Sequence, residues 1–258
     1  MPNHIVNHVC APTEKLTPFV GEAKNERSGE LYLTFDFQQL IPMPEFISAG
    51  SISAKVEIIA KIAMGLIDFN SNLQMPDKPL EDMNGAVAVL QRSNAMRELV
   101  EGGMAMTLDD DDFDSLINMM KAYRSCGSLN SYGWCIEHWG TKWNSYDVEV
   151  LKSSCPTDSV VTQTTVKFET AWSAPHPVIQ ALAKKIGGLR HDWADEDMGH
   201  NVGWAIYDNK GEIVDHKELS KTKEGMEMAI RLHRAEDRWK WSEEKHEYVY
   251  VDDEEAEE

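Results

Sequence analysis

The sequence predicts an α+β fold in which helices back an antiparallel sheet and a large helical insertion interrupts it. Apolar and polar residues alternate in segments before residue 51 and between residues 147 and 214, which is typical of half-buried strands. Between residues 51 and 127, apolar residues instead recur at helical spacing. The order β-α-β, helical insertion, β-α-β and a further hairpin suits a ferredoxin-like topology with two helices on one face of the sheet.

The N-terminal elements are predicted as a strand, a helix and a second strand. Residues 3–9 alternate weakly, and Pro12-Thr13-Glu14 opens a helix of about ten residues with Thr13 as its N-cap. Its expected apolar face is Leu16, Phe19, Val20 and Ala23. Residues 31–37 alternate more cleanly and end at the prolines of residues 41–44, which cannot continue a strand ladder.

The insertion is predicted to hold three helices. Apolar stripes cover residues 56–67, residues 84–100 and a third segment with Phe113, Leu116, Ile117 and Met120. Four aspartates, residues 109–112, precede the third helix, where carboxylates complement the helix dipole. They lack the spacing of a calcium loop, so the sequence does not predict a metal there.

The second half repeats the strand and helix alternation. Strands are expected at residues 147–151, 160–172, 189–192, 202–207 and 212–214. A helix follows Pro177 and stops at Gly187-Gly188, and a last helix is expected from about Lys221 to Arg238, with Met226, Ala229, Ile230 and His233 inward. The predicted domains are residues 1–50 plus 129–216 as the ferredoxin-like core, 51–128 as the insertion, and 217–258 as the C-terminal helix and acidic tail.

Composition and charge limit the kinds of partner that this protein can have. The 258 residues are 42 % apolar, no run approaches a bilayer span, and the N-terminus does not resemble a signal peptide. Four scattered cysteines favour reduced thiols in a cytoplasm. A net charge of −19 disfavours duplex nucleic acid and favours a partner protein with a basic surface, although acidity can serve solubility alone. The last seven residues hold six carboxylates, so a solvated tail is expected.

The segment Tyr132–Tyr146 is the strongest indication of a binding surface. It packs three tryptophans, a histidine, a lysine and an asparagine around two glycines, and aromatic residues are enriched at binding hot spots. The alternative is that the indoles are core residues and Gly140 ends a helix. His138 as a general base would need an orienting carboxylate, which the sequence cannot place.

A second candidate is the acidic and histidine-bearing segment His191–His200. Its carboxylates and imidazoles could ligate a divalent ion, but neighbouring acids in a loop between strands usually face water. The sequence therefore predicts neither a metal nor a cofactor. No phosphate-binding loop, dinucleotide fingerprint or nucleophile elbow is present in the sequence, so an enzyme is not favoured.

Several motifs resemble the YubB-like proteins of phages and conjugative plasmids, which carry a C-terminal ferredoxin-like domain. The matching segments are residues 1–4, 37–45, 134–144, 168–172 and 194–203. The resemblance implies a ferredoxin-like fold and an accessory protein of a mobile element acting inside a bacterial cell. It implies no activity.

These observations favour a non-enzymatic acidic protein that binds a host protein, possibly a nucleic-acid-handling or defence component. The alternative is an enzyme or small-ligand binder whose pocket joins residues 134–144 to residues 191–200. Single-stranded nucleic-acid binding on exposed aromatics ranks last, because no basic patch is visible in the sequence. The candidate binding residues are Trp134, His138, Trp139, Lys142, Trp143, Asn144, Trp172, Asp195, Asp197 and Asn201.

Overall fold

The computed structural model describes residues 3–45, 47, 56–57, 60–61, 110–152 and 162–251. Contacts divide the chain into two compact units, Met1–Pro42 with Cys135–Glu258, and Met43–Trp134. In the second unit the best-defined element is helix α5, Asp110–Cys126, which buries Leu116 and Met120 as the third predicted stripe requires. The two other predicted insertion helices and the acidic tail from Asp252 lie outside the described residues. No helix in the described ranges is long and apolar enough to cross a bilayer.

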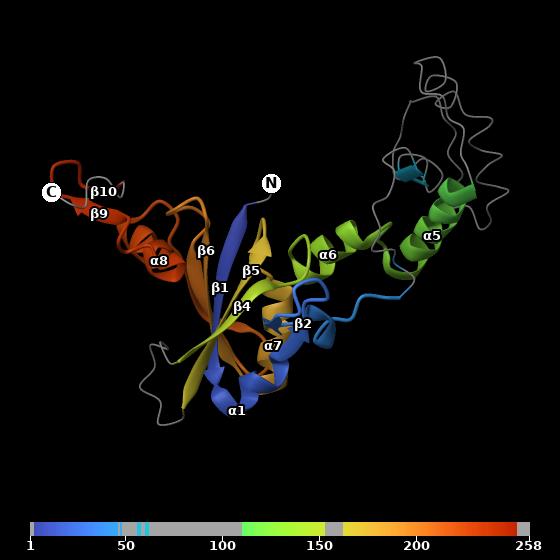
Figure 1. The fold of residues 1–258 in the computed structure, drawn as a ribbon, viewed down its shortest axis with the longest axis horizontal. Helices are drawn as coiled ribbons and strands as arrows, with labels where there is room; N and C mark the ends of the chain where they lie inside the picture. The colour runs from blue at the N-terminus through green and yellow to red at the C-terminus, as the bar shows by residue number, and fades with distance from the viewer. Residues whose placement is uncertain are drawn as a thin grey trace, which may run out of the picture. The chain divides into compact units, whose positions relative to one another are not determined.

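An eight-stranded, wholly antiparallel sheet forms the first unit (Figure 1). Its strand order is β2-β3-β4-β5-β1-β6-β7-β8. The strands are β1 His4–Pro12, β2 Gly21–Lys24, β3 Leu31–Thr34, β4 Tyr146–Lys152, β5 Gln163–Ala171, β6 Leu189–Asp195, β7 Gly203–Tyr207 and β8 Ile213–Glu218.

The four central strands have the ferredoxin-like order. Along the chain β1, β4, β5 and β6 come first to fourth, and in the sheet they lie as β6-β1-β5-β4, so the fourth and first strands are neighbours. Helix α6, Ser131–Trp139, precedes β4, and helix α7, His176–Ile186, joins β5 to β6. The predicted α+β fold with a ferredoxin-like antiparallel sheet is confirmed.

Helix α7 covers one face of the sheet. Pro177 lies in its first turn, Gly187 caps it with a left-handed conformation (φ 89°), and its buried stripe contains Val178, Ile179 and Leu182. The ring of His176 contacts His191 and Trp193 on β6, which fixes the face that α7 occupies. Phe35, Phe37, Phe168 and Trp139 form a ring cluster in the core.

Helix α8, Lys223–His233, covers part of the opposite face. Thr222 caps it by accepting a hydrogen bond from the Gly225 amide, and Met228, Ala229 and Leu232 pack on Val6 and Ala194. Strand β1 therefore has covered faces on both sides, which explains why seven consecutive residues, Ile5–Ala11, are buried instead of alternating. The inward set predicted for this helix is right at Ala229 and Ile230, whereas Met226 is only partly buried.

Three predictions about local structure are wrong. The ten-residue helix after Pro12 is a single turn, α1 Thr13–Leu16, followed by the 3-10 turn η1 Thr17–Phe19 and by strand β2. Pro18 explains this, because it has no amide hydrogen to donate to the Glu14 carbonyl four residues earlier and its ring would clash with that carbonyl in an α-helix. The first two predicted strands consequently form no β-α-β unit: β3 pairs with β2 and β4 at one side of the sheet and ends at Thr34, before the 3-10 turn η2 Phe37–Gln39.

At the C-terminus, α8 ends at His233 and not at Arg238. A hairpin that the sequence pattern did not reveal follows, with β9 Trp239–Ser242 paired to β10 Glu247–Tyr250. The expectation of reduced thiols is wrong at Cys10, which is disulfide-bonded, while Cys126 and Cys135 are free. Burial raises the pKa of Cys135 to about 11, so this thiol is unreactive at neutral pH.

Candidate functional site

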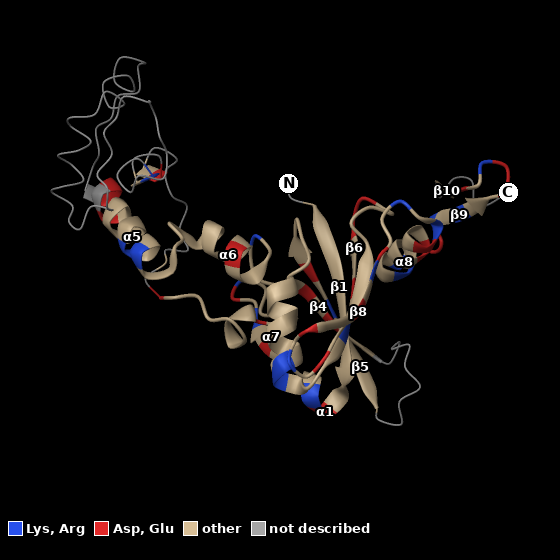
Figure 2. Cartoon of the chain, turned by 180° about the vertical axis from the view of Figure 1, so that it is seen from behind, with Lys and Arg blue, Asp and Glu red and all other residues tan. Residues whose placement is uncertain are grey.

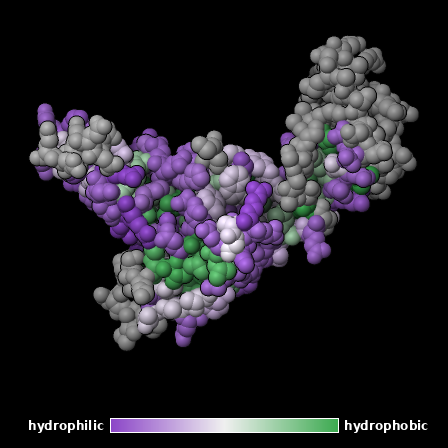
Figure 3. All heavy atoms as spheres, in the orientation of Figure 1, coloured by the Kyte–Doolittle hydropathy of each residue, from purple (hydrophilic) through white to green (hydrophobic). Residues whose placement is uncertain are grey.

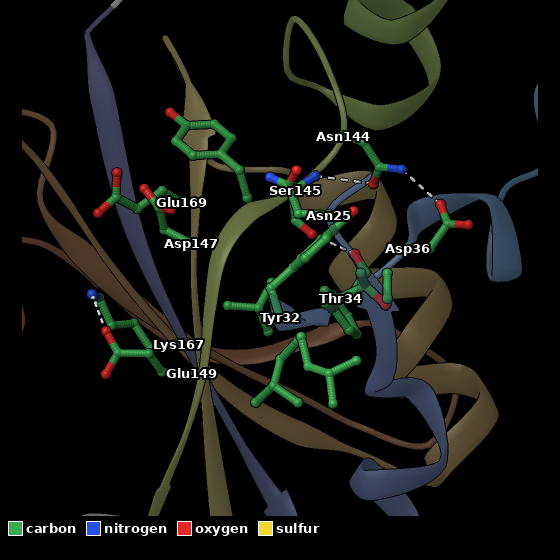
Figure 4. A pocket seen from close by; sticks show the side chains of 16 residues that line it. Asn25, Tyr32, Thr34, Asp36, Asn144, Ser145, Asp147, Glu149, Lys167 and Glu169 are labelled. Atoms are coloured by element: carbon green, nitrogen blue, oxygen red, sulfur yellow. Dashed lines mark hydrogen bonds and ion pairs between the residues drawn. The ribbon is translucent and has the colours of Figure 1, made fainter. Parts of the chain in front are cut away.

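An open cavity of about 1140 Å³ lies on the sheet where β3, β4 and β5 adjoin (Figure 4). Directly paired residues of antiparallel strands project to the same face, so Glu149 of β4, Lys167 of β5 and His8 of β1 share one face. Val6 lies on this face and packs against α8. Because α8 contacts β6 and β1, the part of the face over β3, β4 and β5 is left open.

The polar lining of this cavity is mainly acidic. Asp36, Asp147, Glu149 and Glu169 contribute four carboxylates, against the single ammonium group of Lys167. Hydrophilic residues cover much of the face in Figure 3, with hydrophobic areas among them. The apolar contribution to the cavity includes Leu31 and Tyr32, which are 71 % and 52 % exposed. Exposed apolar groups beside fixed charges are typical of a binding surface.

A bulge in β4 places one of the carboxylates. The pairing of β4 with β5 shifts register between Tyr146 and Glu149, and Asp147 has a left-handed backbone (φ 48°), which is uncommon outside glycine. Asp147 and Glu169 consequently lie beside each other in the cavity (Figure 4). Burial raises the pKa of Glu169, and the Asp147 carboxylate raises it further.

The other end of the cavity is held by ion pairs. Lys167 Nζ lies 2.8 Å from Glu149 Oε1, and Arg234 Nη2 lies 3.0 Å from Glu149 Oε2. The hydrogen bond from Lys167 lowers the pKa of Glu149, so this carboxylate is charged and already neutralised. Asp147, in contrast, has no ion pair with a described residue. Lys167, His4 and His233 lower the pKa of Glu169, but burial and the Asp147 carboxylate outweigh them, so the negative charge at this end of the cavity is only partly compensated.

Polar side chains that contact one another border the Asp147 and Glu169 end of the cavity. Tyr146 Oη lies 2.7 Å from His4 Nδ1, and His4 Nδ1 lies 3.6 Å from Glu169 Oε2. Tyr146 Oη also donates to the Thr170 carbonyl at 3.1 Å. Desolvation and the nearby carboxylates raise the pKa of Tyr146, so the phenol stays protonated at neutral pH. These contacts hold Tyr146 against His4, which lies beside Glu169.

The indoles of the aromatic segment divide into buried and exposed groups. Trp134 and Trp139 are buried, and Trp139 Nε1 donates to the Ile41 carbonyl at 2.9 Å, so both are core residues. Trp143 and Trp172 are 39 % and 44 % exposed, and Lys142 Nζ lies 4.6 Å and 4.5 Å from their ring centroids. Trp143, Trp172 and Lys142 therefore form an exposed aromatic and cationic surface.

The remaining residues of that segment have structural or peripheral positions. Asn144 Oδ1 accepts hydrogen bonds from the Phe37 and Ser145 amides, and Asn144 Nδ2 donates to Asp36 at 2.6 Å (Figure 4). Asn144 therefore ties β4 to the turn before η2 and also lines the cavity. His138 lies on α6, half-buried, and does not line this cavity.

The second predicted segment organises its own loop. Asp195 Oδ1 accepts from the Asp197 amide at 2.9 Å and from Asn3 Nδ2 at 3.2 Å, while Asn201 Nδ2 lies 3.5 Å from Asp195 Oδ2. His200 Nδ1 lies 3.1 Å from Asp197 Oδ2. Of the candidate residues, Asn144 alone lines the cavity, so residues 134–144 and 191–200 are not brought together there. Within the described ranges, no three His, Cys, Asp or Glu side chains are placed to hold a metal.

Sequence reasoning missed the residues that form the cavity. Lys167 and Glu169 interrupt an otherwise apolar and threonine-rich strand on alternate positions, which was a usable sign of a polar sheet face. The sequence around Asp147 and Glu149 gave no indication of the cavity, because the bulge and the pairing of β4 with β5 bring these residues close to Lys167 and Glu169.

A family model agrees with the ferredoxin-like sheet. Residues 138–236 match a family model described as the ferredoxin-like domain in Api92-like protein. The crystal structure of a protein api92 from Yersinia pseudotuberculosis is 9 % identical, with a TM-score of 0.34 over 84 % of this chain and 98 % of that chain. No curated protein matches the sequence. Residues 138–236, from α6 to just beyond α8, thus match the ferredoxin-like domain of Api92-like proteins.

Proposed function

We propose that this protein is a non-enzymatic binding protein that takes a positively charged segment of another protein into the acidic cavity over β3, β4 and β5. The observation that carries the proposal is the neighbouring pair of carboxylates, Asp147 and Glu169, in which Asp147 raises the pKa of Glu169 and nearby cations compensate only part of the charge. A lysine or arginine side chain placed between them would remove their mutual repulsion and gain charge-assisted hydrogen bonds. The exposed Leu31 and Tyr32 would pack on the apolar part of the same segment.

The whole-chain charge supports the same class of partner. A net charge of −19 attracts a basic protein over a long range and repels phosphate backbones. The resemblance of residues 134–144 and 194–203 to YubB-like proteins adds a biological setting to the proposal. In that setting the protein is a phage or plasmid accessory protein, and its partner is a host protein such as one that handles nucleic acid or acts in defence.

A pair of peptides tests the proposal directly. The probe is a synthetic peptide of about eight residues in which lysine alternates with threonine, a length that matches a strand. We expect it to bind with an affinity that falls steeply with added salt, while a peptide with glutamate in place of lysine does not bind. Fluorescence anisotropy of labelled peptides gives both dissociation constants.

The variant Asp147→Asn with Glu169→Gln should weaken binding of the lysine peptide by roughly twofold to thirtyfold, because each of the two partly exposed ion pairs contributes about 0.2–1 kcal/mol. The matched control is Asp215→Asn with Glu218→Gln on strand β8, which removes the same charge from exposed positions outside the cavity. Equal weakening by both variants would show that net charge alone attracts the peptide, and the proposal would then be abandoned.

A further inference from the structure

A cluster of cations lies beside the acidic cavity, on the same sheet face but under α8. The cross-strand row Glu149, Lys167, His8 and Asp192 runs through β4, β5, β1 and β6. Arg190 of β6 lies two residues from Asp192, and Arg231 and Arg234 reach the row from the C-terminal end of α8. In Figure 2 helix α8 carries both blue and red positions, so the helix alone does not reveal this cluster.

The ion pairs leave positive charge in excess. Glu149 is shared by Lys167 and Arg234, at 2.8 Å and 3.0 Å. Asp192 is shared by Arg190 and Arg231, at 2.7 Å and 3.3 Å. Four cations thus depend on two carboxylates, in a protein whose total charge is −19.

His8 lies at the centre of this cluster with an unsatisfied ring nitrogen. Its residue is 8 % exposed, and Nε2 has no hydrogen-bond partner in the described part of the chain. A buried polar atom destabilises the folded protein unless it has a hydrogen-bond partner. Basic residues at the end of α8 are explained in part by the helix dipole, but that explanation covers neither Lys167 and Arg190 of the sheet nor the unpaired nitrogen of His8.

We propose that Arg231, Arg234 and Lys167, with His8 below them, form a binding site for a small oxyanion with phosphate or carboxylate chemistry. The arginine side chains are 49 % and 54 % exposed and form the accessible rim, while Lys167 is 14 % exposed and lies deeper. One guanidinium group can donate two hydrogen bonds at once to the oxygens of a phosphate or a carboxylate. Neutral His8 can donate a further hydrogen bond from Nε2 to the same anion once the side chains of the rim move aside. Glu169, two residues from Lys167 on β5, faces His4 and lies outside the site.

Anion titrations followed by NMR test this site on the full chain. At pH 7 and constant ionic strength, inorganic phosphate and acetate are added separately to isotope-labelled protein, with chloride as the balancing salt. We expect saturable shifts of the His8 ring resonances with phosphate, acetate or both, and the arm that saturates identifies the chemistry. A single-stranded oligonucleotide is a further arm, and saturation by it alone would contradict a small-anion site.

Arg234→Gln should weaken the saturating anion about tenfold, because a charge-assisted hydrogen bond is lost. The matched control Lys210→Gln, on the exposed turn between β7 and β8, removes the same charge outside the cluster and should leave the affinity unchanged. Arg231→Gln serves as a second variant if Arg234→Gln unfolds. Shifts that do not saturate with either anion, or equal weakening by the Lys210 variant, would overturn the proposal. Neither result bears on the lysine peptide.

Discussion

Single residues in this protein have roles that depend on their surroundings more than on their type. Three histidines are held neutral by burial: the pKa of His8 is lowered to about 4, and the pKa values of His176 and His191 are also lowered. At His8, Arg231, Lys167 and Arg234 depress the pKa further. Each of these histidines takes up a proton more readily in the unfolded chain than in the folded one.

Stability should therefore fall on mild acidification. The contribution of His8 is complete above its unfolded pKa of about 6.5 and is lost as pH falls toward its folded pKa of about 4. The shift corresponds to about 3 kcal/mol of unfolding free energy. Urea unfolding between pH 7 and pH 4.5 measures this loss. Carboxylates begin to titrate in the lower part of that range, so the share of His8 is taken from the difference between the wild type and the His8 variant.

The control for that pH dependence is the comparison of two histidine variants. His8→Gln should flatten the pH dependence, whatever its effect on stability at pH 7, while His216→Gln, on the exposed strand β8, should leave the slope unchanged. An unchanged slope in the His8 variant would mean that His8 protonates equally in both states, contrary to its burial.

At the first turn of helix α8, two segments of the backbone approach so closely that no side chain fits between them. Gly225, in the first turn of α8, would place a Cβ atom 2.0 Å from the Leu219 carbonyl oxygen and 3.0 Å from Val202 Cγ1. The helix can pack on the loop before it only because this residue has no side chain. Gly133, within α6, would place its Cβ 3.6 Å from Asn130 Oδ1, an ordinary contact.

These two glycines give a matched pair of substitutions. Gly225→Ala should destabilise the protein by several kcal/mol, because backbone atoms must move to admit the methyl group. Gly133→Ala should be neutral or stabilising by about 0.5–1 kcal/mol, because alanine favours helix. Thermal unfolding measures both. Wild-type stability in the Gly225 variant would show that α8 is not seated as closely as the structure has it.

The whole molecule is organised around β1, which pairs with β5 over its full length and with β6 over most of it. Strands β2 and β8 end the sheet and each pair on one side only within the described residues. All six residues of β8 are exposed. Central strands with two partners and covered faces open only in global unfolding, whereas edge strands open locally.

Hydrogen exchange should reproduce that order. Amides of Val6 and Val9 in β1 should be among the slowest to exchange, and amides of β2 and β8 should exchange orders of magnitude faster. NMR exchange at neutral pH resolves the strands individually. Equal protection of β8 and β1 would indicate that a further partner, such as a second copy of the chain, covers the β8 edge in solution.

Local patterns in the sequence predicted most of the strands, helix α7 and the ferredoxin-like fold class, because alternation and helical periodicity record which face of an element is buried. Pro18 was in the sequence, yet the apolar positions around it misled the prediction of α1. The binding cavity was beyond reach, since Asp147, Glu149, Lys167 and Glu169 meet only through a bulge and strand pairing. The cation cluster around His8 likewise draws on β1, β5, β6 and α8. The buried face of an element can be read from the spacing of apolar residues along the chain. An electrostatic site cannot, because it depends on which distant segments the tertiary structure places a few ångströms apart.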